Sequence, residues 1–575
     1  MGAAPAQFPP PVDPQAEFIK RGLDGKDELI EVGVAIVGGG TAGLACANRL
    51  LALLADDEPL LESLGEVPVA VIEKAKTCGG HLMSGAVMRP GPLQELFPEL
   101  TREDWRRERF AFGEVTREAV YFLTSAKSKL KVPITMVPNF KNHGNEVISV
   151  SALARFQQRL AEEGGAYVLT ETAATRLIVE RGQVVGVRSG DKGRGKDGEP
   201  RGNFEPGSDI KAKVVVLAEG NWGHLTGAAI REFNLGQGRE PQVWELGVKE
   251  VWKVAKPLDR LIHTFTQPWP MKIAPKYGQL GGTWLYPMRD QTTGEDFVSI
   301  GLVVDLNYRD ATTSAHDLLQ QFKTHAMVRE ILDGGERVAW GAKALPGGGY
   351  WSMPKLSMPG AVIVGDGGGM VDTAALKGVH HCINSGRLAA EAIYENLKRG
   401  TSLDSYEGAI ESSSTGKELW RVRNTRQAFQ KGFAMGSLLA GPSIMSKGLL
   451  PRGRQRWHRD DAEPMFIGDT RNGYPKPDGK YTFDKLSSVY MSGNATRDDA
   501  PNHIRVQTHV PREVAETWRW MCPAGVYEIP EDAPQTGEVD VIVNYTNCVQ
   551  CGAITAKGGR LTPPEGGDGP LYTVT

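Results

Sequence analysis

The stretch Val34-Ala-Ile-Val-Gly-Gly-Gly-Thr-Ala-Gly43 decides the fold of this 575-residue chain. Its first four residues form a short apolar run of the kind found in buried strands. Glycines follow at the spacing G-x-G-x-x-G, and the helix-like segment 44–54 comes directly after them. In a βαβ unit these glycines permit a tight turn, a close approach of backbone to a pyrophosphate, and packing of helix on strand. The alternative is a turn in a core without a ligand. We predict a dinucleotide site built by Gly38, Gly40 and Gly43.

Three later turns favour FAD as the dinucleotide. A second strand at 67–72 ends in Glu73, whose carboxylate can accept hydrogen bonds from ribose hydroxyls. The turn Ala218-Glu-Gly220 follows a strand at 214–217, and Gly365-Asp366 follows a strand at 361–364. In glutathione-reductase-like flavoproteins such a Gly-Asp turn, far down the chain, holds the ribityl and phosphate groups of FAD. We therefore predict that Glu73, Gly365 and Asp366 complete the FAD site.

Composition excludes some classes of function. The formal net charge is −3 and 23% of the residues are charged, so we expect no nucleic-acid partner. Six cysteines without a secreted-type framework indicate a reducing compartment. No secretory signal is recognisable at the start, and no apolar stretch reaches about 18 residues, so we expect no membrane-spanning helix.

Three cysteines gather near the end of the chain. Cys522 is followed by a proline, and Cys548-Val-Gln-Cys551 places two thiols on one tight loop. Ferredoxin-type iron–sulfur sites use C-x2-C-x2-C with a remote Cys-Pro, but Ile554 stands at the position of the last cysteine in this pattern. A cluster with three cysteine ligands, of three irons or of four irons with another ligand, is one interpretation. A cysteine set without a cluster and a zinc site are the others.

An apolar segment near the middle of the chain is ringed by cations. Phe429–Leu450 has no charged residue between Lys431 and Lys447, and it is too short to span a bilayer. Either this segment inserts into one leaflet of an anionic membrane, or it is a core-facing helix with a solvated basic end. The flanking residues are Lys417, Arg421, Arg423, Arg426, Arg452, Arg454, Arg456, Trp457 and Arg459.

From about residue 33 to the end, the chain resembles the electron-transfer flavoprotein–ubiquinone oxidoreductase (electron-transfer flavoprotein dehydrogenase) family. The resemblance rests on the glycine fingerprint and on motifs that occur in the family's order. These include His81-Leu-Met-Ser-Gly-Ala86, Asn142-His-Gly-Asn145, Ala218-Glu-Gly220, Tyr474-Pro-Lys-Pro-Asp-Gly479, Cys522-Pro-Ala-Gly-Val-Tyr527 and Pro563-Pro-Glu-Gly-Gly567. The chain departs from the family at Ile554, where the family has a fourth cluster cysteine.

The resemblance implies a mixed α/β and α+β architecture. A glutathione-reductase-like FAD-binding fold would carry an inserted β-rich quinone domain and a C-terminal ferredoxin-like iron–sulfur domain. The implied parts are an N-terminal arm (1–32), a discontinuous FAD-binding domain (33–245 and 346–400), a ubiquinone-binding β-sheet domain (246–345), a helical membrane-contacting segment (401–460) and the iron–sulfur domain (461–575).

The resemblance also implies an activity. The enzyme would accept electrons from reduced electron-transfer flavoprotein and pass them through FAD, with a 4Fe-4S or 3Fe-4S cluster held by Cys522, Cys548 and Cys551, to ubiquinone. Gly281 and Gly282 would line the quinone pocket, and segments 81–100 and 429–450 would contact the membrane. The protein would be a monomer, peripheral or monotopic on the inner (cytoplasmic) membrane of a bacterium or on the mitochondrial inner membrane.

Two other functions fit the residues. An FAD-dependent reductase of an apolar isoprenoid substrate would need neither a cluster nor a donor flavoprotein. A membrane-docked flavin-binding scaffold would have lost electron transfer together with the fourth cysteine. Electron transfer depends on cofactor proximity more than on an acid–base pair, so no catalytic side chain is predicted.

Overall fold

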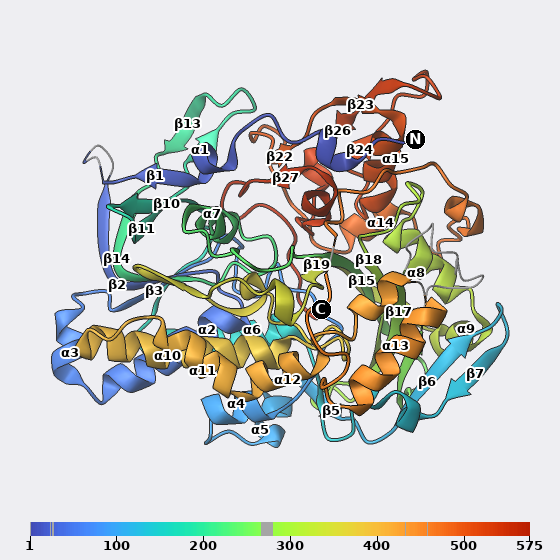
Figure 1. Ribbon diagram of the computed structural model, residues 1–575, viewed down its shortest axis with the longest axis horizontal. Helices are drawn as coiled ribbons and strands as arrows, with labels where there is room; N and C mark the ends of the chain where they lie inside the picture. The colour runs from blue at the N-terminus through green and yellow to red at the C-terminus, as the bar shows by residue number, and fades with distance from the viewer. Residues whose placement is uncertain (1, 24, 26–27, 266–279, 432, 457) are drawn as a thin grey trace.

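Strand β2 (Leu29–Val37) runs through the centre of the first of two large sheets (Figure 1). The computed structural model describes the chain except for residues 1, 24, 26–27, 266–279, 432 and 457. β2 is parallel to β14 (Asp209–Leu217) and to β3 (Val69–Ile72), its two neighbours. Because both faces of this sheet are covered, Val34 and Ile36 are fully buried, as their apolar run predicts.

The remaining strands of the first sheet extend it on both sides of β2. The path order is β1-β10-β11-β14-β2-β3-β9, with β21 added beside β14 and β20 beside β21. Their bounds are β1 (Ile19–Arg21), β9 (Tyr167–Leu169), β10 (Ala174–Glu180), β11 (Gln183–Ser189), β20 (Ser357–Met358) and β21 (Ala361–Ile363).

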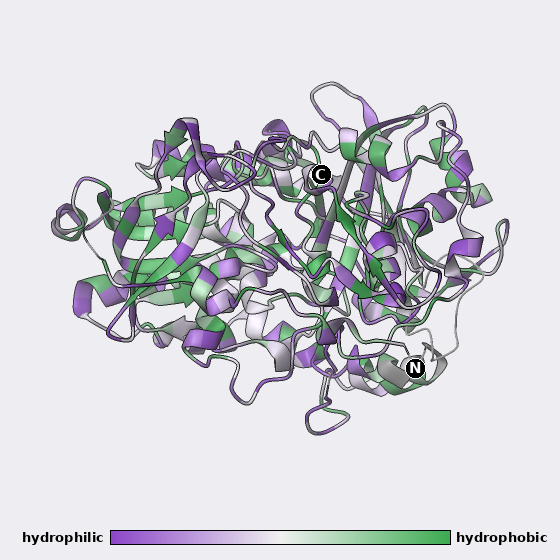
Figure 2. Cartoon of the chain, turned by 90° about the horizontal axis from the view of Figure 1, so that it is seen from above, coloured by the Kyte–Doolittle hydropathy of each residue, from purple (hydrophilic) through white to green (hydrophobic). Residues whose placement is uncertain are grey.

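Helices cover both faces of this sheet. On one face, α2 (Thr41–Ala55) packs against α10 (Val379–Arg399) and α6 (Val150–Glu163). A Cβ at Gly386 of α10 would lie 2.1 Å from the Ala42 carbonyl oxygen, so glycine there allows the two helices to touch. On the other face lies α7 (His224–Glu232). Figure 2 shows the strands between these layers as largely hydrophobic.

A second, mainly antiparallel sheet lies beside the first (Figure 1). Its order is β19-β15-β18-β17-β16-β6-β7, and α8 (Ala315–Lys323) packs on β15 and β18. The described residues of 246–345 are thus rich in strands, as the resemblance implies. The strand bounds are β6 (Glu118–Leu123), β7 (Lys129–Val132), β15 (Trp244–Lys253), β16 (Leu261–Phe265), β17 (Gly281–Arg289), β18 (Asp296–Asp305) and β19 (Glu336–Pro346).

The C-terminal region packs directly on the second sheet. It consists of α14 (Lys485–Tyr490), α15 (Arg512–Met521) and three two-stranded ladders. Trp518 and Ile554 belong to the same hydrophobic cluster as Phe322 of α8 and Trp340 of β19. The ladders are β22 (Ile504–Arg505) with β27 (Arg560–Leu561), β23 (His509–Pro511) with β25 (Glu538–Asp540), and β24 (Tyr527–Glu528) with β26 (Ile542–Val543).

Several segments differ from the sequence-based expectations. Residues 1–32 contain α1 (Pro14–Phe18) and β1, which pairs with β10, in place of a purely extended arm. β6 and β7 lie inside the range expected for the FAD-binding domain, but β6 pairs with β16 in the second sheet. Within the expected FAD-binding domain, β12 (Lys192–Arg194) and β13 (Pro200–Glu205) form a separate hairpin.

The expectation that residues 81–100 contact a membrane is wrong. Met88 and Leu93 are fully buried, and Leu96 and Phe97 of the same segment pack with them in one core cluster. Leu93 and Leu96 belong to α4 (Gly91–Leu96), which rests against α10. Apolar composition alone does not tell a core-facing segment from one that faces lipid.

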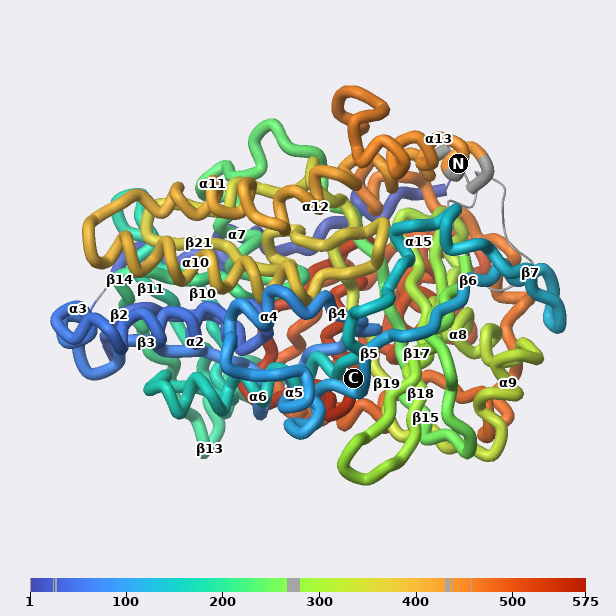
Figure 3. The backbone as a smooth tube through the Cα atoms, turned by 90° about the horizontal axis from the view of Figure 1, so that it is seen from below, coloured from blue at the N-terminus to red at the C-terminus, as the bar shows by residue number. Residues whose placement is uncertain are grey.

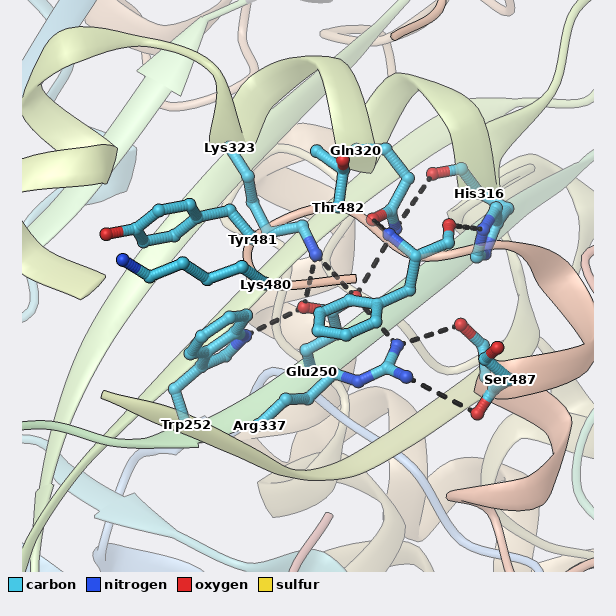
Figure 4. Close-up of polar contacts among 12 residues, drawn as sticks. Glu250, Trp252, His316, Gln320, Lys323, Arg337, Lys480, Tyr481, Thr482 and Ser487 are labelled. Carbon is cyan, nitrogen blue, oxygen red and sulfur yellow. Dashed lines mark hydrogen bonds and ion pairs between the residues drawn. The ribbon is translucent and has the colours of Figure 1, made fainter. Parts of the chain in front are cut away.

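A buried carboxylate links the second sheet to the C-terminal region (Figure 4). Glu250 of β15 accepts hydrogen bonds of 2.7 and 2.8 Å from Lys323 Nζ, and its Oε1 lies 3.4 Å from an Arg337 guanidinium nitrogen. The side chains of Glu250 and Lys323 are fully buried. Arg337 also donates to Ser488 Oγ of α14 at 2.9 Å. Burial opposes the charge on Glu250, but Lys323 and Arg337 hold its pKa below the usual value.

We expect Glu250→Gln to destabilise the protein by roughly 3–5 kcal/mol, because it leaves two buried cations without their counter-charge. Denaturant unfolding measures the loss. The matched control is Glu295→Gln, which breaks the exposed ion pair with Lys253 and is expected to leave the stability almost unchanged. Equal losses in the two variants would contradict the role given to Glu250.

Candidate functional site

A cavity of about 280 Å³ lies at the carboxyl ends of β2, β3 and β14. This is the edge at which open α/β sheets bind their ligands. Its opposite wall comes from the second sheet, through Gly247, Trp284, Tyr286 and Val303. The cavity therefore lies between the two sheets and not within either of them.

The three glycines of the fingerprint occupy three different environments. Gly38 has φ +111°, and a Cβ there would lie 2.4 Å from the Ala218 carbonyl oxygen. A Cβ at Gly43 would lie 2.2 Å from the Gly38 carbonyl oxygen, so only glycine lets α2 start this close to β2. At Gly40 the nearest atom would be 3.8 Å away, so its backbone is open toward the cavity. The N-terminus of α2 follows at Thr41 and directs its N–H groups to this side.

Two acidic side chains stabilise the loops that line the cavity. Glu73, at the end of β3, accepts hydrogen bonds of 2.8 Å from the backbone N–H groups of Gly39 and Ala75. Glu219 accepts from Thr226 N and Oγ1, both at 2.7 Å, at the start of α7. Burial raises the pKa of Glu219. Glu73 is thus placed at the glycine loop by direct contacts.

Gly365 and Asp366 lie at the end of the β21 strand, on the same edge of the sheet. Gly365 has φ +65° and its N–H donates to Ser385 Oγ at 2.9 Å. Asp366 lines the cavity, and the Cys382 thiol donates to its Oδ1 at 3.3 Å. Burial raises the pKa of Asp366, so a polar ligand that donates to this carboxylate would stabilise its charged form.

The cavity fits a dinucleotide by its polar groups as well as by its position. Trp222 Nε1 and His81 Nδ1 are buried, and neither has a hydrogen-bond partner among the described residues. Both residues line the cavity. Buried polar atoms are normally paired, so a polar ligand is the expected partner here.

On the side of the second sheet, a tyrosine and a histidine form a buried pair. Tyr286 lines the cavity, and its hydroxyl shares a hydrogen bond of 2.7 Å with His263 Nε2. His263 Nδ1 is buried without a partner among the described residues. Burial lowers the pKa of His263 to about 3 and raises that of Tyr286, so both side chains are neutral at pH 7.

Gly281 and Gly282 open β17 and pair with Val304 and Val303 of β18. A Cβ at Gly281 would lie 2.3 Å from the Val303 carbonyl oxygen, which explains the glycine by strand packing. The pair comes shortly after residues 266–279, which lie outside the described residues. Along β17, Gly282 precedes Tyr286 by four residues, which is two repeats of the strand pleat. A role in a quinone pocket stays a prediction.

The cysteine loop forms part of the cavity wall. Gln550 and Gly552, on either side of Cys551, line the cavity. Lys74, next to Glu73, donates to Gln550 Oε1 at 2.7 Å, and Lys343 of β19 donates to the Gln550 carbonyl oxygen at 3.2 Å. Burial lowers the pKa of Lys343 to about 8. The predicted dinucleotide and cysteine sites are therefore adjacent.

The structure brings the three clustered cysteines together. Cys522, Cys548 and Cys551 line one small cavity, and Ile554 lines it as well. Burial raises the pKa of each thiol, that of Cys551 to about 12. Three thiols fit three corners of a cubane cluster, whereas the side chain at the fourth position, Ile554, cannot bind iron. Cys46, Cys78 and Cys382 are buried elsewhere.

Sequence reasoning did not find Lys74, Lys343, Gln550, or the pair of His263 and Tyr286 as site residues. Lys74 follows Glu73, and Gln550 lies between Cys548 and Cys551. Their places beside predicted site residues could have identified them as neighbours of the site. Lys343 carried none, because it is one polar residue within a strand. His263 and Tyr286 meet only because β16 pairs with β17.

Comparisons with known proteins agree with this geometry. The family model for the ubiquinone-binding domain of ETF-QO matches residues 244–345. The model for the 4Fe-4S domain of electron transfer flavoprotein-ubiquinone oxidoreductase matches residues 479–573. A solved geranylgeranyl bacteriochlorophyll reductase-like protein from Thermoplasma acidophilum covers 74% of this chain and 93% of its own, at a TM-score of 0.51 and 18% identity. That likeness shows a shared fold.

Relatives match over nearly the whole chain. The mitochondrial electron transfer flavoprotein-ubiquinone oxidoreductase of Oryza sativa subsp. japonica is 36% identical, covering 96% of this chain and 95% of that protein. The electron transfer flavoprotein-ubiquinone oxidoreductase of Pseudomonas aeruginosa is 35% identical, covering 95% of this chain and 99% of that protein. These matches confirm the resemblance carried by the motifs: the chain belongs to the electron transfer flavoprotein-ubiquinone oxidoreductase family.

Proposed function

We propose that this protein is a membrane-associated flavoprotein oxidoreductase that takes electrons from reduced electron-transfer flavoprotein and passes them through FAD to ubiquinone. The observation that carries the proposal is that three parts of the chain line one and the same cavity. Its walls are the glycine fingerprint, the sheet of the ubiquinone-binding domain, and the cysteine loop of the 4Fe-4S domain. Three redox sites of one electron path would meet at this point.

FAD would be held by the residues at the carboxyl edge of the first sheet. Gly40 and the N-terminus of α2 would take the pyrophosphate, with Gly38 and Gly43 allowing the close approach. Glu73 fixes the glycine loop, and Asp366 would accept from a ribitol hydroxyl. Bound FAD would supply chemistry with one or two electrons. The chain's own contribution is to orient the flavin and to keep water from it.

Reduction of a quinone to a quinol consumes two protons as well as two electrons. Tyr286 would give one of them, because this residue lines the cavity and its hydroxyl is hydrogen-bonded to the buried His263. If Tyr286 gives its proton to a quinone oxygen, a proton from solvent must replace it, because neutral His263 has no second proton to pass on; the 2.7 Å hydrogen bond from His263 would orient the hydroxyl. The predicted contact of Gly281 and Gly282 with the quinone would lie further along β17, because neither glycine is among the residues that line this cavity.

α13 (Phe433–Met445) and the turn after it would contact the membrane surface. None of the described helices combines the length and apolar character needed to cross a bilayer. Leu438 and Met445 are nevertheless 70% and 87% exposed, and Leu449 is 64% exposed. In Figure 3, α13 lies at the edge of the molecule, outside both sheets. Trp457, expected in the basic rim, lies outside the described residues.

Beside these apolar side chains lies a basic hollow of about 370 Å³. Lys417, Arg421 and Lys447 line it together with Trp420. Cations next to exposed leucine and methionine favour docking on an anionic lipid surface, with the apolar residues in the acyl boundary. This location would be the inner (cytoplasmic) membrane in a bacterium or the inner membrane in a mitochondrion.

The whole proposal is tested by mixing the purified protein with reduced electron-transfer flavoprotein and a ubiquinone analogue. We expect quinol formation that depends on both partners. Reduction of the bound flavin without quinol formation would reject the acceptor, and no flavin reduction would reject the donor.

We expect Glu73→Ala to weaken FAD binding by about 10- to 100-fold, because two charge-assisted hydrogen bonds to the glycine loop are lost. Titration of the apoprotein with FAD measures the dissociation constant. Glu66→Ala removes an exposed glutamate of the preceding connection and is expected to leave binding unchanged. Unchanged binding in Glu73→Ala would contradict its role.

We expect Tyr286→Phe to slow quinone reduction by about 100-fold while flavin reduction by the donor keeps its rate. If proton donation by Tyr286 limits the wild-type rate, that rate should fall in D2O, and Tyr286→Phe should reduce this solvent isotope effect. Stopped-flow absorbance follows the two half-reactions separately. Tyr490→Phe, at an 84% exposed position, is the control. A quinone half-reaction within about twofold of wild type would rule Tyr286 out as a proton donor.

We expect the double variant Leu438→Glu with Met445→Glu to bind anionic phospholipid vesicles at least about tenfold more weakly, since two exposed apolar anchors are replaced by anions. Vesicle co-sedimentation measures binding. Leu486→Glu with Tyr490→Glu adds the same charge at exposed positions of α14 and should bind as wild type does. If both double variants bind equally, α13 is not the docking surface.

A further inference from the structure

The three clustered thiols face a preformed pocket. Cys522 follows α15, and Cys548 and Cys551 lie on the loop between Asn547 and Ala553. All three line a cavity of about 20 Å³ whose other walls are almost wholly apolar. The three thiols therefore share one buried, apolar space.

Backbone N–H groups already point at two of the sulfurs. Ala524 N and Val526 N each lie 3.4 Å from Cys522 Sγ, and Gln550 N lies 3.4 Å from Cys548 Sγ. Such N–H groups stabilise thiolate ligands and tune the cluster that they hold. The loops around these thiols are therefore arranged for thiolates bound to a metal centre.

The spacing of the sulfurs argues against zinc. In a tetrahedral site with Zn–S bonds of about 2.3 Å, neighbouring sulfurs lie about 3.8 Å apart. Among the described residues, these three sulfurs do not form a group in which all lie within 4.8 Å of one another. Sulfurs that bind separate irons of one cluster are spread more widely, because each contacts its own corner.

The fourth corner is closed by apolar side chains. Ile554 is 4% exposed, and its Cγ1 would lie 2.5 Å from a Cβ at Gly559, so close packing fixes it in place. Met521, Val549 and Leu561 also line the pocket. The lining holds no carboxylate or imidazole among the described residues. An iron at this corner would need a water or hydroxide ligand, and burying such a group beside Ile554 and Leu561 without a partner is costly.

We propose that this chain assembles a three-iron, four-sulfide cluster, in which Cys522, Cys548 and Cys551 each bind one iron and the corner facing Ile554 holds none. This departs from the four-iron cluster named in the matched domain model. The inference rests on the iron–sulfur centre of the proposed function, but it does not depend on which donor or acceptor the enzyme uses.

The test is chemical analysis and electron paramagnetic resonance (EPR) of the full-length protein, purified anaerobically and reconstituted with iron and sulfide. We expect about three irons and four sulfides per chain. The oxidised protein should give an EPR signal, because three coupled ferric ions leave a half-integer spin. An oxidised four-iron cluster with paired spins is silent. Neither measurement needs turnover, so failure of the proposed activity would not affect the result.

A matched pair of variants sharpens the test. Ile554→Cys supplies the missing thiol, so we expect about four irons per chain, loss of the signal of the oxidised protein and a new signal after reduction. Ile554→Val keeps the corner apolar and should keep three irons. Four irons in the wild-type protein, zinc in place of iron, or no cluster in protein that retains its flavin would each overturn the proposal.

Discussion

The buried charge of Glu250 ties the second sheet to the C-terminal region that carries the cysteines. Its carboxylate, on β15, is shared by Lys323 of α8 and Arg337 of β19, and Arg337 reaches on to α14 of the C-terminal region. Each charge is stabilised only while the others are present. The C-terminal region is thereby held against the second sheet, and the cysteine loop against the cavity wall.

The site itself depends on close backbone approach more than on reactive side chains. Gly38 and Gly43 let β14, β2 and α2 converge at one edge, and Gly386 lets α10 touch α2 behind it. Acidic residues then fix the loops: Glu73 at the glycine turn and Glu219 at the start of α7. This division suits an electron-transfer protein, in which the cofactors carry the chemistry and the chain sets their positions.

Local patterns predicted the parts of the fold that local physics determines. The run Val34–Gly43 indicated β2 and α2, whereas the second sheet was expected only from the family resemblance. Contacts between distant strands could not be predicted in this way. Lys343 has no local signal, and His263 meets Tyr286 across the β16–β17 pairing. The prediction of membrane contact for segment 81–100 was wrong because a buried helix and a lipid-facing helix can have the same apolar composition.

Gln550 and Gly552 belong to the loop that carries two cysteines and also to the wall of the dinucleotide cavity. One loop therefore borders both cavities, the predicted dinucleotide site and the pocket of the three cysteines. A chain whose cysteine loop has not folded has an incomplete flavin cavity, since Lys74 and Lys343 then lack the partner that orders them. Order in the cysteine loop and order in the wall of the dinucleotide cavity are therefore coupled through Gln550.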